Sequence, residues 1–196
     1  IKILLIIMIK KFFFILFFSL ISFSSFSHLE HYKNLKKFEF NLYRNDNLIG
    51  QHIYFFEKDG NKLIVKSEIN FTIKKLGIEL YKYNANGTET YIDEKLVSFT
   101  SKTNQNGKKK YVNMKLEGNQ YIIDGSSYKG KVSAAAVIGT WWNHSIVKAK
   151  AQVSAVSGRI IKQNVKFIGK ENIDIDGKKI KTLHFVFTSS DKKLDK

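Results

Sequence analysis

The chain has no cysteine and no proline, and it has almost no arginine. Without cysteine it can form no disulfide, carry no acylated lipoprotein cysteine, and use neither thiol catalysis nor a cysteine-type zinc site. Packing alone must therefore hold the fold together. No nucleic-acid partner is expected either, because only Arg44 and Arg159 offer the bidentate guanidinium that base and phosphate recognition favours.

Lysine instead supplies most of a formal net charge of +16 over 196 residues. Because isoleucine, asparagine and phenylalanine are abundant too, this composition indicates a coding bias toward AT-rich codons rather than selection for a polyanion. A weak attraction to anionic surfaces, such as anionic lipid or a cell-wall polymer, is compatible with the charge. Lys108-Lys109-Lys110 follows Asn106-Gly107 and fits either a solvated hairpin flank or an anion-binding tip.

Residues 1–27 have the layout of a secretory signal peptide. From Met8 the chain has two lysines, an apolar run over residues 12–23, and small residues before a break near Ser27/His28. The apolar run is about twelve residues long, whereas a membrane-spanning helix needs roughly 20. We therefore expect Met8 to be the true start, the leader to be cleaved, and the mature form to have no transmembrane span.

The alternative is a longer signal-anchor that keeps Lys10 and Lys11 inside the membrane, at a cost of roughly 2.5–3.5 kcal/mol for each lysine at its centre. The cleaved form is expected to be periplasmic or secreted, with residues 28–196 as a single β-rich domain. The sequence ends at Lys196 directly after a strand-like run, which indicates truncation at the C-terminus.

The region after the leader has the pattern of successive β-strands. Leu63, Val65 and Ile69 lie on one side of an alternating run, with Lys66 and Glu68 on the other. The same period of two recurs in residues 37–42, 161–167 and 183–187. Turn signals separate the runs at residues 45–47, 59–61, 104–107, 117–119 and 176–177. These features predict a mainly β fold, with an antiparallel, strongly curved sheet that forms a half-barrel or a barrel.

Residues 132–148 break this pattern. The stretch contains Ala134-Ala135-Ala136 and lacks clean alternation, so it predicts one or two short helices, which Gly139 would interrupt. A sheet with one apolar face must cover that face, and this segment is the expected cover.

No catalytic or metal-binding pattern stands out. The chain has no Gly-x-Ser-x-Gly elbow and no phosphate-cradling glycine loop, and Gly125-Ser126-Ser127 fits a simple loop. His28 and His31 lie at the new N-terminus, and the other three histidines are isolated, with no His-x-x-x-His motif and no acidic neighbour at ligand spacing. Neither a metal nor a cofactor is therefore expected. An enzyme, most readily a hydrolase, is the least favoured function.

Aromatic residues give the clearest functional indication. Several strands carry bulky groups on both faces, as with Ile53 and Phe55 opposite Tyr54 and Phe56. Such a strand either lies within a well-filled interior or lines a cavity for an apolar ligand. The residues expected to line or gate such a cavity are Trp141, Trp142, Tyr81, Tyr83 and His52.

Three short pieces of sequence carry a resemblance. They are residues 49–52 (Ile-Gly-Gln-His), the stretch from Glu89-Thr90-Tyr91 to residues 103–107, and residues 140–143 (Thr-Trp-Trp-Asn). In this order they resemble a family of uncharacterised exported bacterial proteins known as a domain of unknown function. That family is similar in layout to periplasmic curved-sheet domains, some related to lipoprotein carriers. Its members usually continue into a further strand, which agrees with truncation here.

The resemblance implies export, a β-rich fold and a hydrophobic ligand, and it supplies no catalytic residue. The leading functional prediction is an exported binding module that holds a lipid-like or other apolar small molecule inside its curved sheet. The alternative is a structural or assembly partner of an envelope protein, which uses a sheet edge or an aromatic patch and has no small-molecule ligand.

Overall fold

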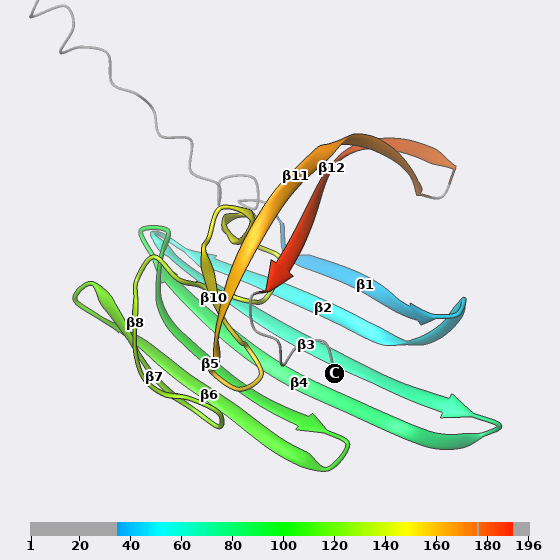
Figure 1. The fold of residues 1–196 in the computed structure, drawn as a ribbon, viewed down its shortest axis with the longest axis horizontal. Helices are drawn as coiled ribbons and strands as arrows, with labels where there is room; N and C mark the ends of the chain where they lie inside the picture. Colours follow the sequence, from blue (N-terminus) through cyan, green and yellow to red (C-terminus); the bar gives the residue numbers. More distant parts are fainter. Residues whose placement is uncertain (1–34, 176, 190–196) are drawn as a thin grey trace, which may run out of the picture.

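The computed structural model describes residues 35–175 and 177–189, so the predicted leader, its cleavage position and the last seven residues lie outside the described part. The first eight strands form one antiparallel sheet in chain order, each joined to the next by a tight turn (Figure 1). They are β1 (Lys37–Arg44), β2 (Asn47–Asp59), β3 (Lys62–Lys75), β4 (Ile78–Ile92), β5 (Lys95–Gln105), β6 (Lys108–Glu117), β7 (Gln120–Gly125) and β8 (Lys129–Ser133).

A second sheet of four strands lies over the first (Figure 1). It has the order β12-β11-β10-β9, in which only the β9–β10 pair is parallel. The members are β9 (Val137–Ile138), β10 (Ala151–Val153), β11 (Ile160–Ile175) and β12 (Lys178–Ser189). The predicted mainly β fold with a strongly curved antiparallel sheet is confirmed. The sheet is open, with β1 and β8 at its edges, and is a half-barrel.

The period of two in the sequence separates the two faces of the large sheet. Val65, Phe99 and Val112 point to the concave side and are at most 1% exposed. Lys66 and Asn70, on the same strand as Val65 but of opposite parity, are exposed. Successive side chains of a strand alternate between faces, so this pattern fixes the register of the whole sheet.

The core lies between the concave face and the segment of residues 134–157, which we call the cover. Ala136, Ile138, Trp142 and Val153 of the cover are buried against the apolar residues of β2 to β7. Each large side chain buried in this way contributes roughly 1.5–3 kcal/mol to the free energy of unfolding. The cover therefore buries the apolar concave face, which would be exposed to solvent in a half-barrel without it.

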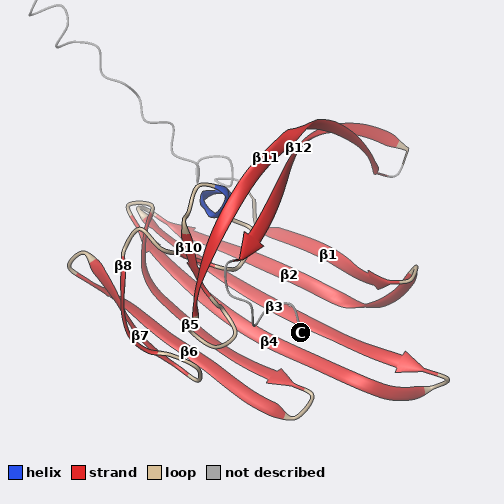
Figure 2. Ribbon diagram, viewed as in Figure 1, coloured by secondary structure: helices blue, strands red, loops and turns tan. Residues whose placement is uncertain are grey.

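Of the one or two short helices predicted for residues 132–148, the structure has a single 3₁₀ turn, η2 (His144–Val147), drawn in blue in Figure 2. The Asn143 side chain caps it by accepting a hydrogen bond of 2.9 Å from the Ser145 amide. The alanine run forms a turn between β8 and β9 instead of a helix. Three alanines are too few to nucleate a helix when neighbouring backbone groups already pair with strands.

The β11–β12 hairpin is an arm that leaves the body of the molecule (Figure 1). β11 pairs with β10 only over residues 160–162, and further along it pairs only with β12. Large apolar side chains on both strands, among them Phe167 and Leu183, are about half exposed. Within the described residues no helix is long and apolar enough to cross a membrane.

Candidate functional site

A cavity of about 170 Å³ lies between the concave face and the cover. It exists because small side chains fall side by side on three adjacent strands. Ser67 of β3, Gly87 of β4 and Ser101 of β5 are paired across the sheet, and Ala85 lies one step further along the same face of β4. The flanking positions of that face carry bulky groups, so the small residues leave space that the cover does not fill.

The walls of the cavity are held by the sheet and the cover together. Tyr54 and Phe99 form fully buried walls, each 1% exposed. The Tyr54 hydroxyl donates a hydrogen bond to the Thr140 carbonyl, and the Ser101 hydroxyl donates one of 2.5 Å to the Ala155 carbonyl. These two bonds fix the cover on both sides of the cavity, so its shape is largely preformed.

The polar side chains that line the cavity are uncharged. Burial lowers the pKa of His52 to about 4, so this imidazole is neutral at pH 7. The hydroxyls of Thr103 and Thr140 are buried and form no hydrogen bond of acceptable geometry among the described residues, although each lies beside a polar neighbour, Tyr83 and Glu89 respectively. Both residues line the cavity, beside Tyr83 and Glu89.

Glu89 joins the sheet to the cover beside the cavity. It is 2% exposed, and its carboxylate accepts hydrogen bonds of 2.5 Å from the Tyr91 hydroxyl and 2.7 Å from the Trp142 indole nitrogen. Burial raises the pKa of Glu89, while these two donors favour the charged form. Both carboxylate oxygens are occupied by donors from the core, so we assign this group to positioning the cover rather than to chemistry.

The predicted site residues are only partly brought together. His52, Tyr83 and Trp141 line the cavity. Trp142 lies in the core, where its ring packs edge-on against Phe56 at 5.3 Å and against Tyr91 at 5.8 Å. The fifth residue, Tyr81, lies further out on the concave face.

Stacked aromatic rings extend the concave face outward from the cavity. Phe71 stacks on Tyr83 at 5.0 Å and on Tyr81 at 5.9 Å. Phe40 and His52 continue this surface toward β1, with 6.3 Å between their rings. Phe40 is half exposed, so the surface is open to solvent beyond the cavity.

The small residues that create the cavity were not predicted from the sequence. The signal was present, because Ser67 interrupts a run of Leu63, Val65, Ile69 and Phe71 at a position where the alternation calls for a bulky side chain. Ala85 and Gly87 interrupt the aromatic face of β4 in the same way. A single strand with such a gap is uninformative, and only the register of β3, β4 and β5 shows that the gaps coincide.

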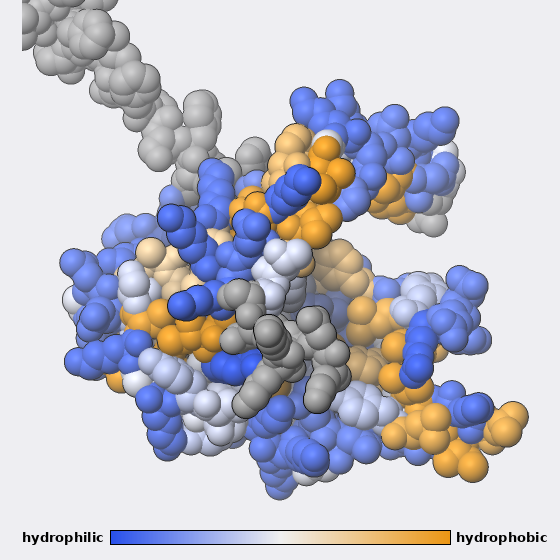
Figure 3. Space-filling view, in the orientation of Figure 1, coloured by the Kyte–Doolittle hydropathy of each residue, from blue (hydrophilic) through white to orange (hydrophobic). Residues whose placement is uncertain are grey.

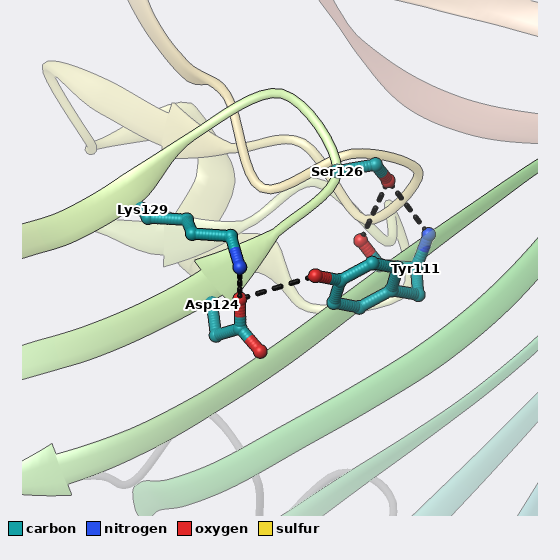
Figure 4. Close-up of polar contacts among 4 residues, drawn as sticks. All are labelled: Tyr111, Asp124, Ser126 and Lys129. Atoms are coloured by element: carbon teal, nitrogen blue, oxygen red, sulfur yellow. Dashed lines mark hydrogen bonds and ion pairs between the residues drawn. The ribbon is translucent and has the colours of Figure 1, made fainter.

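A polar cluster on β6, β7 and β8 is the nearest arrangement to a catalytic group (Figure 4). The Ser126 hydroxyl accepts a hydrogen bond of 2.7 Å from the Tyr111 amide and donates one of 3.0 Å to the Tyr111 carbonyl. Lys129 pairs with Asp124 at 2.8 Å, and this contact lowers the pKa of Asp124. Since backbone groups occupy the serine hydroxyl and the lysine faces the carboxylate, the cluster closes a turn and activates no nucleophile.

The structure confirms that Ser126 and Ser127 belong to a loop. Among the described residues, no three histidine or acidic side chains come together as a metal site. His52 hydrogen bonds to no carboxylate within the same part of the chain. The cavity is therefore suited to holding an uncharged apolar group, with hydroxyls to orient it.

Comparison with known proteins gives a family and no function. A family model described as a domain of unknown function, DUF6134, matches residues 40–196. No curated protein and no solved structure matches the chain. The matched range includes the whole cavity and both sheets, apart from the first three residues of β1. The chain belongs to the DUF6134 family.

Proposed function

We propose that this protein is an exported binding module that holds an apolar group in the cavity under its cover. The observation that carries the proposal is the preformed cavity of about 170 Å³, whose lining is mainly apolar and includes the neutral His52. An engineered cavity of about 150 Å³ binds benzene, whereas sites for drug-sized ligands measure roughly 300–1,000 Å³. The buried part of the ligand is therefore a ring or a short aliphatic segment.

The rest of a larger ligand has a surface to follow. The stacked rings of Phe71, Tyr81 and Tyr83 continue outward from the cavity on the same face of the sheet. A lipid-like molecule would bury one end against Phe99 and lay its remaining length on these rings. Export to the periplasm or secretion is proposed from the leader pattern of residues 1–27.

The test is ligand-dependent stabilisation of the full chain, measured as the melting temperature with toluene and with dodecanoic acid. A ligand at 100 times its dissociation constant adds about 2.7 kcal/mol to the free energy of unfolding. Ala85→Leu fills the cavity from β4 and should abolish the rise in melting temperature. Thr88→Leu, on the opposite face of the same strand, is the matched control and should retain it. Equal stabilisation of both variants, or none of the wild type, would contradict the proposal.

A second candidate function is a structural or assembly partner in the cell envelope. It is favoured by the β11–β12 arm, whose Phe167, Ile168 and Leu183 are each about half exposed, with no covering element in the described part of the chain. In that case Ala85→Leu would leave binding to the envelope partner intact, while Phe167→Ser combined with Leu183→Ser would abolish that binding.

A further inference from the structure

The turn between β3 and β4 exposes aliphatic side chains that the fold leaves uncovered. Leu76 is 93% exposed, Ile78 66% and Leu80 53%, and we call these three residues the tip patch. Figure 3 shows hydrophobic surface gathered over the ends of β3 and β4. Exposed apolar residues that cluster at one place mark an interaction site more often than isolated ones do.

The backbone at this turn makes Leu76 costly for the fold. Its φ is +50°, in the left-handed region that glycine and asparagine tolerate and that costs other residues roughly 1–2 kcal/mol. A leucine here is almost fully solvated and adds nothing to the core. Neither folding nor packing accounts for an aliphatic side chain at this position.

Lysines surround the tip patch. Lys74, Lys75 and Lys82 flank it in sequence, against a single acid, Glu79. None of these lysines forms an ion pair within the described part of the chain. The surface therefore combines exposed aliphatic groups with uncompensated positive charge.

Two neighbouring turns place further exposed apolar residues and lysines at the same end of the sheet. Because the strands run antiparallel in chain order, the β1–β2 and β5–β6 turns lie at the end where β3 meets β4 (Figure 1). The first contributes Tyr43 and Leu48, both more than half exposed, and the second contributes Lys108-Lys109-Lys110. The turns at the opposite end of the sheet expose no large apolar residue among those described.

We propose that this end of the sheet docks on an anionic lipid bilayer. The tip patch enters the boundary between headgroups and acyl chains, and the surrounding lysines face the lipid phosphates. Shallow burial of apolar groups combined with attraction of basic residues to anionic lipid is the usual basis of such peripheral binding, with each lysine near the surface contributing about fivefold in affinity. The inference does not depend on a ligand in the cavity.

The absence of cysteine allows a local test on the full chain. Leu76→Cys and Glu94→Cys each introduce one thiol, at turns of positive φ on opposite ends of the sheet. Each is labelled with a nitrobenzoxadiazole group and mixed with phosphatidylcholine vesicles, with and without about 30% phosphatidylglycerol. We expect a blue shift and a rise in emission for the label at position 76 on anionic vesicles, and no change at position 94. A local label also separates docking of the tip from any binding by residues 1–27.

Charge variants of the labelled Leu76→Cys protein complete the test. Lys74→Gln, Lys75→Gln and Lys82→Gln together should weaken the response to anionic vesicles at least tenfold. The matched control replaces three lysines at the other end of the sheet with glutamine: Lys58, Lys62 and Lys95. It should change the response to anionic vesicles by no more than about threefold. No response at position 76, equal responses at positions 76 and 94, or equal effects of the two lysine sets would each overturn the proposal.

Discussion

Trp141 and Trp142 are adjacent in the chain and lie in opposite environments. Trp142 is 6% exposed, and its indole nitrogen donates to Glu89. Trp141 has a φ of +71°, is 58% exposed, and packs edge-on against Phe187 of β12 at 5.2 Å. One residue therefore joins the cover to the sheet, while the other forms the outer wall of the cavity.

Trp142→Phe should lower the free energy of unfolding by about 2–3 kcal/mol. The phenyl ring keeps part of the packing, but Glu89 loses a buried donor, and an unsatisfied buried group costs roughly 1–3 kcal/mol. Trp141→Phe is the matched control and should cost less than about 1 kcal/mol, as exposed positions usually do. Urea denaturation of both variants measures the difference, and equal losses would show that Trp142 does not hold the cover.

His52 should make stability depend on pH. Its folded pKa of about 4 lies below the usual value of 6.5, so between these values the unfolded chain binds a proton that the folded chain does not. The contribution of His52 to the free energy of unfolding is fully present above pH 6.5. It falls as the pH drops from 6.5 to 4 and does not change further below pH 4. Because the ring is partly exposed, we expect the loss to be about 2 kcal/mol.

His52→Phe keeps an aromatic ring against Tyr54, whose centroid lies 4.2 Å from that of His52, and removes the titration. The difference in unfolding free energy between wild type and variant should change by about 2 kcal/mol between pH 7 and pH 4. The contribution of Glu89, whose raised pKa acts in the opposite sense, cancels in this difference. A difference that is constant with pH would show that His52 is not buried in the folded protein.

At the scale of elements, the large sheet and the cover are packed against each other, whereas most of the β11–β12 arm makes few buried contacts. β3, β4 and β5 each have strand partners on both sides and the cover on one face. The β11–β12 arm has one partner per strand over most of its length, with exposed apolar groups on both strands. Local stability follows buried contacts, so these elements should open independently.

Amide hydrogen exchange should separate the arm from the sheet. Amides of residues 169–175 and 177–184 lie beyond the contacts of Phe185 with His144 and of Phe187 with Trp141. They should exchange at least a hundredfold faster than those of Val65, Gly87 and Phe99, because opening this part of the arm exposes little of the core. Mass spectrometry of peptides from the exchanged chain measures both regions in one experiment. Protection of these residues equal to that of β4 would mean that the arm also packs against the molecule beyond Phe185 and Phe187.

Turns show where sequence pattern succeeds and where it fails. The turns at residues 45–47, 59–61, 104–107, 117–119 and 176–177 were predicted from asparagine, aspartate and glycine, and all five join adjacent strands. The turns at Leu76-Gly77 and Asp93-Glu94 were missed. Asp93 and Glu94 both have positive φ without a glycine. The pairing of β4 with β5 and the hydrogen bonds between Asp93 and Asn61 hold that conformation.

At the scale of the whole molecule, the sequence predicted the sheet better than the site. The alternation of apolar and polar residues predicts which side chains lie on the apolar face, because this period of two depends on each strand alone. The cavity depends on which strands are neighbours and on where the cover crosses them. Trp142 and Trp141 look alike in the sequence, and their separate roles follow from the placement of Glu89 and of β12.

The central claim is that a preformed, mainly apolar cavity lies between the concave face and the cover, and xenon tests it most directly. Xenon occupies apolar cavities of this size without any specific chemistry. In crystals of the protein pressurised with xenon, we predict one strong anomalous peak bounded by Ala85, Phe99 and Thr140. The account is contradicted if that space is filled by the protein's own side chains or by ordered water, with no xenon bound.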